Sequence, residues 1–396
     1  MSLSAGITGD DSLAHVVVDR LRTMPSDERL PNGVISFDIE ADHNFSLRSA
    51  DGRTSFEWGS THHPDATVYT DAVTLRRILD DRLSGVEAFL DGRLRVRGNL
   101  ALALSLNRTW GNGSRPSHFP TARTARAGRY DTLYLEAGTG ETMVLLHGLG
   151  ATNASMLPTM HEFAPDYRVV VPDLPGFGGS AKPFRPLHAQ FFARWLNDFM
   201  IATGIDKAHL VGNSMGGRVA IEMGLSFPER VQSLVLLAPS PAFIKNRQFV
   251  QLVRVLRPEL ALLPTPVTRG LVMRLLRSLF ARPERIADAW HEAAADEFLR
   301  VFSSPLGRIC FFSAARQIYL EEPYGDDGFW DRLPSLQARS LFVWGDRDRV
   351  VPASFKRHVD RVLPSASSVV MNDCGHVPQY ELPGRTHRSI REFIRQ

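Results

Sequence analysis

HLVGNSMGGRVAIEMG, residues 209–224, is the stretch that decides the fold of this chain. An apolar run ends in Gly-Asn-Ser-Met-Gly, and apolar residues then recur at helical spacing from Val219. A strand that turns this sharply into a helix accepts only glycine two residues on either side of the serine. Ser214 is therefore the candidate nucleophile. Because G-x-S-x-G also occurs by chance in glycine-rich loops, the prediction depends on the rest of the chain.

Composition indicates a folded protein of ordinary type. The chain has 396 residues, which exceeds one typical domain, so two domains are expected. The hydrophobic fraction of 43% and the charged fraction of 22% are ordinary for a globular protein. The net charge of +3, carried mainly by arginine, is too small to predict nucleic-acid binding, which needs a basic stripe on a recognisable module.

Cysteine usage and the N-terminal residues bear on the compartment. The two cysteines, Cys310 and Cys374, are predicted to be reduced thiols. Asp10-Asp11 stands where a signal peptide has its apolar core, and no apolar run approaches the roughly 20 residues of a membrane span. The sequence therefore predicts a cytoplasmic protein. Adjacent histidines at His62-His63 have no second ligand cluster, so neither a metal nor a cofactor is predicted.

The apolar pattern of residues 11–110 predicts a separate α+β domain. A segment with helical periodicity begins at Asp11, and alternating apolar residues over 34–58 predict antiparallel strands with a hairpin turn at Asp51-Gly52. A second helical period covers 71–83, and a further strand is expected within DGRLRVRGNLALAL, residues 91–104. Residues 111–127, rich in Gly, Ser, Thr, Pro and Arg, are predicted to be an interdomain linker.

This first domain resembles the sterol-carrier-protein type 2 family of lipid-binding domains over roughly residues 13–106. The strand, Asp-Gly turn and strand match, as do the helix that ends near Gly85 and the closing stretch of residues 91–104. The resemblance implies an apolar tunnel for an acyl chain or a sterol. From the residues alone, only a core of sheet and helix follows.

In residues 128–396 strands and helices alternate, which predicts a mostly parallel sheet with helices on both faces. One buried strand leads into His147-Gly148-Leu149-Gly150. Another leads into a glycine-rich turn after Asp173, which lacks the Gly-Lys-Ser/Thr of a phosphate loop, so Asp173 is interpreted as structural. The alternation stops at about residue 240 and resumes at 340. Residues 240–336 are therefore predicted to be a helical insertion.

Two further strand ends carry candidates for an acid and a base. GDRDRVVP, residues 345–352, contains Asp348 and its competitor Asp346 directly after a strand. His376 follows the last strand, 28 residues after Asp348, which suits a strand-helix-strand crossover. A serine, then a carboxylate, then a histidine in this chain order is the order of one class of catalytic triads.

These stretches together resemble the α/β-hydrolase fold family of serine hydrolases. The resemblance implies Ser214 as nucleophile, Asp348 as the acid through G-x-x-D-x-x-V-P, and His376 as the base. It also implies an oxyanion hole made by the backbone N–H groups of Leu149 and Met215, and it implies that the insertion is a cap over the active site.

The predicted function is hydrolysis of a carboxylic ester through an acyl-enzyme intermediate. The expected substrate is a small hydrophobic molecule, a lipid or acyl ester. A carbon-carbon bond hydrolase of the same fold is the alternative, because GNSMGG looks like the elbow of those enzymes, although they commonly carry tryptophan where Val377 stands. A third interpretation is a non-catalytic lipid-binding or transfer protein whose hydrolase part is only a scaffold. Such scaffolds tend to lack members of the catalytic triad, whereas this chain has all three.

The insertion is strongly basic at its start. Over residues 240–282, eight lysines and arginines stand against one acidic residue, and leucines recur at helical spacing from Leu271. A basic amphipathic helix is able to rest on an anionic membrane surface. The other interpretation is a cap helix that packs its leucines over the pocket and solvates its arginines. The oligomeric state stays open.

Overall fold

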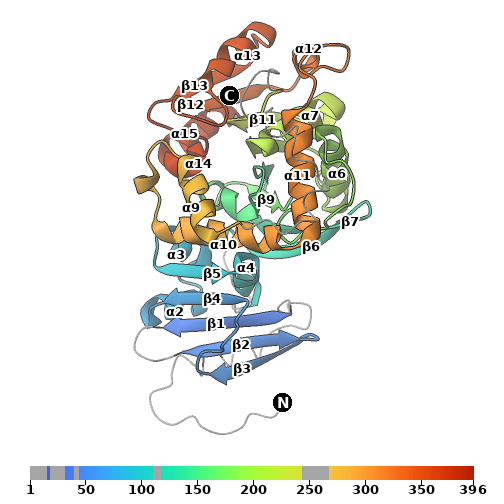
Figure 1. Cartoon of the computed structure of the whole chain (residues 1–396). Helices are drawn as coiled ribbons and strands as arrows, with labels where there is room; N and C mark the ends of the chain where they lie inside the picture. Colours follow the sequence, from blue (N-terminus) through green and yellow to red (C-terminus); the bar gives the residue numbers. More distant parts are fainter. Residues whose placement is uncertain (1–15, 18–31, 40–43, 110–116, 243–266) are drawn as a thin grey trace. The chain divides into compact units, whose positions relative to one another are not determined.

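The computed structural model describes residues 16–17, 32–39, 44–109, 117–242 and 267–396 (Figure 1). The chain divides into two compact units, Met1–Thr121 and Ala122–Gln396. Most of the helix predicted from Asp11, and the first half of the basic insertion, lie outside the described residues.

The first unit is a mixed sheet with helices packed on it, as its resemblance implied. The sheet has the order β3-β2-β1-β4-β5, and β1 is parallel to β4 while the other pairs are antiparallel. The predicted hairpin turn is confirmed at Asp51 and Gly52, where φ is 51° and 70°. The elements are β1 (Gly33–Ile39), β2 (Phe45–Ala50), β3 (Arg53–Trp58), β4 (Ala66–Thr70), α2 (Ala72–Leu79), α3 (Gly85–Leu90), β5 (Leu94–Gly98) and α4 (Leu100–Thr109).

The second unit contains an eight-stranded sheet of the order β13-β12-β11-β10-β8-β9-β7-β6. The strands from β13 to β9 pair in parallel, and β7 runs antiparallel to β9, which confirms the mostly parallel sheet. The strands are β6 (Thr121–Ala127), β7 (Tyr130–Ala137), β8 (Thr142–Leu146), β9 (Arg168–Pro172), β10 (Ala208–Asn213), β11 (Val231–Leu237), β12 (Ser340–Gly345) and β13 (Ser367–Met371).

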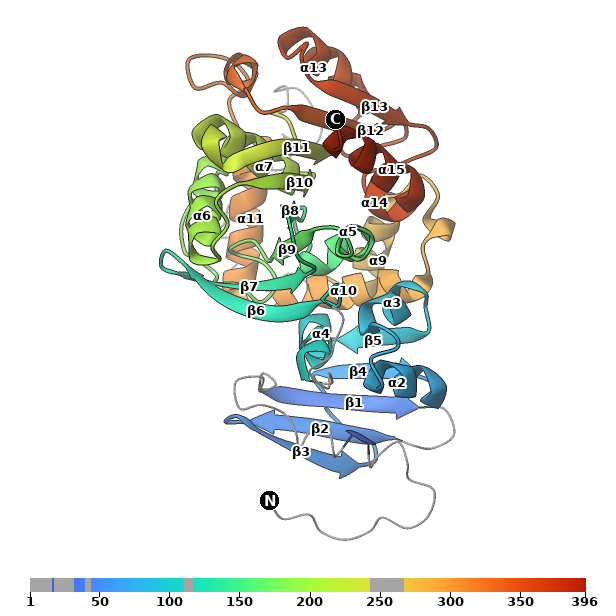
Figure 2. The ribbon, with the colours of Figure 1, turned by 180° about the vertical axis from the view of Figure 1, so that it is seen from behind.

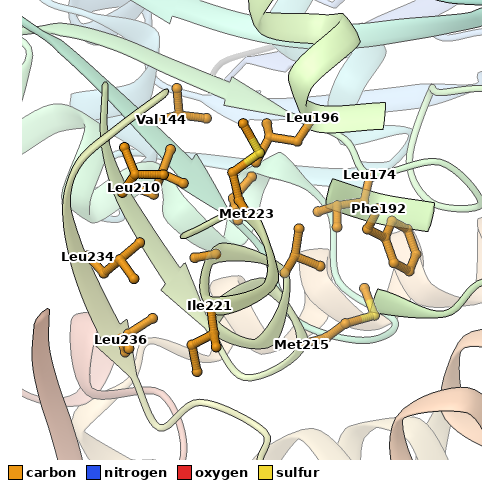
Figure 3. Packing of buried hydrophobic residues seen from close by; sticks show 14 of the residues in the cluster. Val144, Leu174, Phe192, Leu196, Leu210, Met215, Ile221, Met223, Leu234 and Leu236 are labelled. Carbon is orange, nitrogen blue, oxygen red and sulfur yellow. The ribbon is translucent and has the colours of Figure 1, made fainter. Parts of the chain in front are cut away.

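Helices cover both faces of this sheet, because its central strands are apolar on both sides. α6 (Ala189–Ala202) and α7 (Met215–Ser226) lie on one side of the central strands, and α5 (Leu157–Phe163) and α15 (Pro383–Ile394) lie on the other (Figure 2). On the α6 and α7 side, Val144, Leu210 and Leu234 of neighbouring strands pack in one buried cluster with Met223 of α7 and Leu196 of α6 (Figure 3). This packing fixes α7, and with it the turn at Ser214.

One segment differs from its predicted state. Residues 121–127 were expected in the linker, but they form β6, the edge strand next to β7. Its inward side chains are only alanines, while Arg123 bonds Glu136 at 2.7 Å and Arg126 bonds Asp131 at 3.0 Å. An edge strand that carries charges protects the sheet from further pairing. Because alanine and arginine give no apolar alternation, the periodicity did not reveal this strand.

The described residues of the insertion between β11 and β12, from 267 onward, contain helices joined by turns and loops, and no strand. The insertion contains α9 (Arg269–Ser278), the short 3-10 turn η4 (Pro283–Arg285), α10 (Asp288–Ser303), α11 (Pro305–Tyr319) and α12 (Phe329–Arg332). After β12 the chain adds α13 (Lys356–Val362) and α14 (Pro378–Glu381). Among the described helices of the whole chain, none is long and apolar enough to cross a membrane.

Candidate active site

Ser214 stands at the turn between β10 and α7 with a φ of +54°, a value that a non-glycine residue rarely adopts. The two flanking glycines are required by close contacts. A Cβ on Gly216 would lie 2.2 Å from the carbonyl oxygen of Leu146, and a Cβ on Gly212 would lie 2.4 Å from the backbone of Gly216. The steric reason for the predicted elbow is therefore confirmed. The N–H of Ser214 donates to Leu237 at 3.0 Å, which ties the turn to β11.

His376 and Asp348 lie together, with 2.7 Å between Nδ1 of the imidazole and Oδ2 of the carboxylate. The other carboxylate oxygen, Oδ1, accepts the N–H groups of Val350 at 2.8 Å and Val351 at 2.9 Å. Asp348 is only 6% exposed, so these hydrogen bonds stabilise the negative charge of a buried carboxylate. Because an ionised carboxylate only accepts, Nδ1 of His376 donates and Nε2 is left as the basic nitrogen.

Asp346, the competing acid, has a different partner. Its Oδ1 accepts the N–H of Cys374 at 3.1 Å, and the N–H of Arg347 donates to the carbonyl of Cys374 at 3.0 Å. Asp346 therefore joins the loop after β12 to the loop after β13. It shapes the surroundings of His376 without contributing the bond to the imidazole.

Asn213 connects the elbow to the histidine loop. Its side-chain nitrogen donates to the carbonyl of Leu237 at 2.9 Å and to the carbonyl of His376 at 3.0 Å. Since Ser214 is the next residue, these bonds place the elbow beside the backbone of His376. In the sequence, Asn213 occupies only a variable position of the G-x-S-x-G motif. No local pattern predicts its bond to His376, because the two residues are 163 positions apart.

The loop after β8 passes next to the serine. A Cβ on Gly148 would lie 3.4 Å from the Cβ of Ser214. His147 is buried and locks this loop: its Nδ1 bonds the carbonyl of Gly148 at 2.8 Å, and its Nε2 accepts the N–H of Leu174 at 3.0 Å. Burial lowers the pKa of His147 to about 4, so the ring is neutral near pH 7 and Nδ1 carries its proton. Leu149, one of the two candidate oxyanion donors, follows directly in this loop.

Met215, the second candidate donor, is the first residue of α7, and it is buried. The first N–H groups of a helix have no partner within the helix, and they lie at the positive end of its dipole. Met215 directly follows Ser214, and the loop that contains Leu149 passes next to the serine at Gly148, so both stay candidate donors. Asp173 supports the same region, since its carboxylate accepts the N–H groups of Asn153 and Gly179, both at 2.7 Å.

Aromatic side chains of the insertion pack on this loop. A Cβ on Gly150 would lie 2.9 Å from the ring of Phe311 on α11 and 3.0 Å from the ring of Phe298 on α10. Tyr319, at the end of α11, has a pKa raised to about 12 by burial and by the charge of Asp348. The insertion therefore covers the loop at Gly150 with two apolar rings, and the charge of Asp348 acts on Tyr319 of the same insertion. Such a wall favours an apolar substrate group.

No group of three or more His, Cys, Asp or Glu side chains that could hold a metal ion occurs in the part of the chain that the structure describes. Cys310 and Cys374 are free and buried, and burial raises their pKa values to about 11 and about 12. Both thiols are therefore protonated near pH 7 and are poor nucleophiles.

The first unit holds an apolar pocket between the face of its sheet and its helices. The lining contains no ionisable side chain, and it draws on three strands and on α2, α3 and α4. The residues are Phe37, Val68, Leu75, Ile78, Gly85, Phe89, Leu94, Val96, Leu100, Ala103, Leu104 and Leu106. A pocket of this chemistry suits an alkyl chain or a ring system.

Comparisons with known proteins agree with this division of the chain. Residues 141–383 match the alpha/beta hydrolase fold family, and residues 28–110 match the SCP-2 sterol transfer family. The first match covers more than half of the chain, and it includes the elbow, the acid and the histidine.

The relatives include hydrolases of carbon-carbon bonds and of esters. The chain is 32% identical over 278 residues to a 2-hydroxy-6-oxononadienedioate/2-hydroxy-6-oxononatrienedioate hydrolase of Burkholderia vietnamiensis, covering 66% of this chain and 90% of that protein. It is 30% identical over 264 residues to the pimeloyl-(acyl-carrier protein) methyl ester esterase of Aeromonas hydrophila, covering 65% and 96%. The crystal structure of a membrane phospholipase A, a bacterial virulence factor, matches with a TM-score of 0.61 and 27% identity, covering 75% and 92%.

Proposed function

Since the chain belongs to the alpha/beta hydrolase fold family and carries an SCP-2 sterol transfer domain before its hydrolase unit, we propose that it is a serine hydrolase of hydrophobic carboxylic esters. The observation that supports this most directly is the 2.7 Å bond between His376 and Asp348 beside a strained Ser214. A serine hydroxyl is a weak nucleophile near pH 7, so it needs a base whose pKa lies close to that pH.

In the proposed reaction, Oγ of Ser214 attacks the ester carbonyl carbon while Nε2 of His376 takes the hydroxyl proton. Asp348 keeps the imidazole in the tautomer with its proton on Nδ1 and stabilises the imidazolium. The N–H groups of Leu149 and Met215 hydrogen-bond the oxyanion. His376 then gives the proton to the leaving alcohol. Water cleaves the acyl-enzyme by the same steps and restores the free serine.

Ester cleavage is favoured over carbon-carbon cleavage by two features. The residue after His376 is Val377, where the ring-cleavage hydrolases that the sequence resembles commonly carry tryptophan. The rings of Phe298 and Phe311 give the loop side of the site an apolar wall. The relative from Burkholderia vietnamiensis keeps carbon-carbon hydrolysis as the second candidate.

A series of p-nitrophenyl esters from acetate to palmitate separates these two functions. We expect kcat/KM to rise at least tenfold from acetate to octanoate, because each buried methylene contributes about 0.8 kcal/mol when it is fully desolvated. A 2-hydroxy-6-oxo-dienoate is assayed beside the series. Faster cleavage of the dienoate, or acetate as the best ester, would favour the second candidate.

We further propose that the pocket of the first unit binds the acyl chain or sterol part of a lipid. The ester substrate of the hydrolase unit would then itself be a lipid. The support is the wholly non-ionisable lining and the SCP-2 sterol transfer match. A tethered lipid site raises the local concentration of a poorly soluble substrate around the hydrolase unit.

Replacing Ala103 with tryptophan is expected to fill this pocket. Ala103 lines it from α4 and is 8% exposed. In the full-length protein, Ala103→Trp should weaken binding of a fluorescent long-chain fatty acid by more than tenfold, measured by titration. Val73→Trp, on the exposed face of α2, is the matched control and should bind as the wild type does. Unchanged fatty-acid binding by Ala103→Trp would place the lipid elsewhere.

Two arginines of α9 are paired with acidic side chains of α10. Arg269 pairs with Asp296 at 3.0 Å, and Arg277 pairs with Asp288 at 2.5 Å. Leu271 and Leu275 are nevertheless exposed on α9. The described residues from 267 to 282 therefore support the interpretation of α9 as a cap helix, with two of its arginines held by α10, more than a membrane contact.

A further inference from the structure

The segment that follows α9, residues 279–285, lies directly against the loop that carries His376. The N–H of His376 donates to the carbonyl of Leu279 at 2.6 Å. A Cβ on Gly375 would lie 2.3 Å from that same carbonyl oxygen and 2.8 Å from the nitrogen of Ala281. Only glycine permits so close an approach. We call residues 279–285 the clasp segment, because its backbone holds the backbone of the histidine loop.

Glu381 joins the clasp segment to the histidine loop with one carboxylate. Its Oε1 accepts the N–H of Arg282 at 2.6 Å, and its Oε2 accepts the N–H of Gly375 at 2.6 Å. Glu381 is 3% exposed, and its bond to the N–H of Gly375 is buried while its bond to the N–H of Arg282 is partly buried. Bonds of N–H groups to an ionised carboxylate are about twice as strong as those to a neutral acceptor. Removing the carboxylate would take the acceptor from both N–H groups, and that of Gly375 is buried.

A second layer of charges lies nearer the surface. Asp373 pairs with Arg282 at 3.1 Å, with Arg285 at 2.6 Å and with Arg347 at 3.0 Å. The hydrogen bond from Arg282 is the main reason that the pKa of Asp373 is lowered. Exposed ion pairs of this kind contribute little each, because water and salt screen them. Among the polar contacts described here, the buried carboxylate of Glu381 is therefore the stronger connection.

The backbone of His376 is thus held from three sides. Asn213 donates to its carbonyl at 3.0 Å, Leu279 accepts its N–H, and Glu381 accepts the N–H of the residue before it. We propose that Glu381 is a positioning residue for the general base: it sets the place of His376 relative to Ser214 by tying the histidine loop to the insertion. This inference rests on the proposed function, since it assigns His376 as the base.

Two consequences follow if Glu381 acts through His376. A base displaced by about 1 Å slows the chemical step by about a hundredfold, while the contacts that bind the substrate stay in place. The loss should therefore fall on kcat and leave KM nearly unchanged.

The test compares Glu381→Gln with Glu381→Asp in the full chain. We expect Glu381→Gln to lower kcat about a hundredfold with KM changed less than twofold. Glu381→Asp keeps a carboxylate but is one methylene too short to reach both N–H groups. It should lower kcat about tenfold, also with KM changed less than twofold, which is a partial rescue relative to Glu381→Gln. A thermal melt shows whether Glu381→Gln folds. If it does not, the kcat and KM of Glu381→Asp test the inference instead.

Two controls separate this inference from simpler explanations. Glu136→Gln alters a carboxylate of β7 that bonds Arg168 and Arg123, and it should leave kcat within twofold of the wild type. Asp373→Asn, at a position with a φ of +56° that asparagine tolerates, should lower kcat less than threefold. A wild-type kcat in folded Glu381→Gln, or a loss confined to KM, would overturn the inference. Wild-type hydrolysis that survives Ser214→Ala would instead overturn the proposed function itself.

Discussion

Ser214→Ala is expected to lower kcat for the best p-nitrophenyl ester by about 10⁵-fold, since the variant lacks the hydroxyl that forms the acyl-enzyme. The two cysteines cannot replace the serine, because their buried thiols are protonated near pH 7. Backbone oxyanion donors stay in place, so a residual rate above that of water alone is expected. Folding should be unaffected, because alanine keeps the backbone at the same φ.

Two measurements check this result. Ester hydrolysis gives the rate, and labelling by a fluorophosphonate probe reports whether an activated serine is present. Ser278→Ala, on the exposed face of α9, is the control and should hydrolyse and label as the wild type does. A Ser214→Ala protein that keeps more than a hundredth of the wild-type rate, or still labels, would contradict the assignment of the nucleophile.

Asp348→Asn is expected to lower kcat by about 10⁴-fold while the fold stays intact. The reason lies in the two oxygens of the carboxylate. Oδ1 accepts two N–H groups, from Val350 and Val351, so the amide oxygen of asparagine must take that place. The amide NH₂ then faces Nδ1 of His376 and forces the proton onto Nε2. In that tautomer the imidazole cannot accept the proton of Ser214.

Asp346→Asn is the matched control for this prediction. The introduced asparagine would keep the acceptor that Asp346 gives to the N–H of Cys374, so the histidine loop stays joined to the loop after β12. We expect a loss of kcat below about tenfold. The pair of variants is compared by steady-state kinetics across pH. Equal losses in the two variants, or a larger loss in Asp346→Asn, would reverse the assignment of the acid.

Parts of the site could be read from the sequence because their causes are local. The elbow at Ser214 is one in part, since a Cβ on Gly212 would meet the backbone of Gly216 within the same turn, whereas Gly216 itself contacts Leu146 of the neighbouring strand β8. The hairpin at Asp51 is another, because Asp-Gly accepts positive φ at both positions. The buried strands of the second unit were also legible, because runs of valine and leucine suit a parallel sheet covered on both faces.

Other parts depend on contacts between distant residues, which only the tertiary structure decides. Asp346 and Asp348 are two residues apart in one loop; the family resemblance favours Asp348, but the spacing alone does not say which carboxylate turns toward His376. The turn that lets Val350 and Val351 bond Asp348 settles it. Residues 121–127 pair as a strand only because β7 is beside them.

The sequence by itself determined the fold class, the two parts of the chain and the residues that can do the chemistry. Steric limits on backbone turns and the periodicity of apolar residues act within a few positions, so a single sequence displays them. The tertiary structure alone decided how those residues are held. Asn213 and Glu381 reach the histidine loop and the clasp segment through hydrogen bonds, which are directional and join residues up to 163 positions apart. Such bonds form only after packing has brought β10, α14 and the insertion to one place.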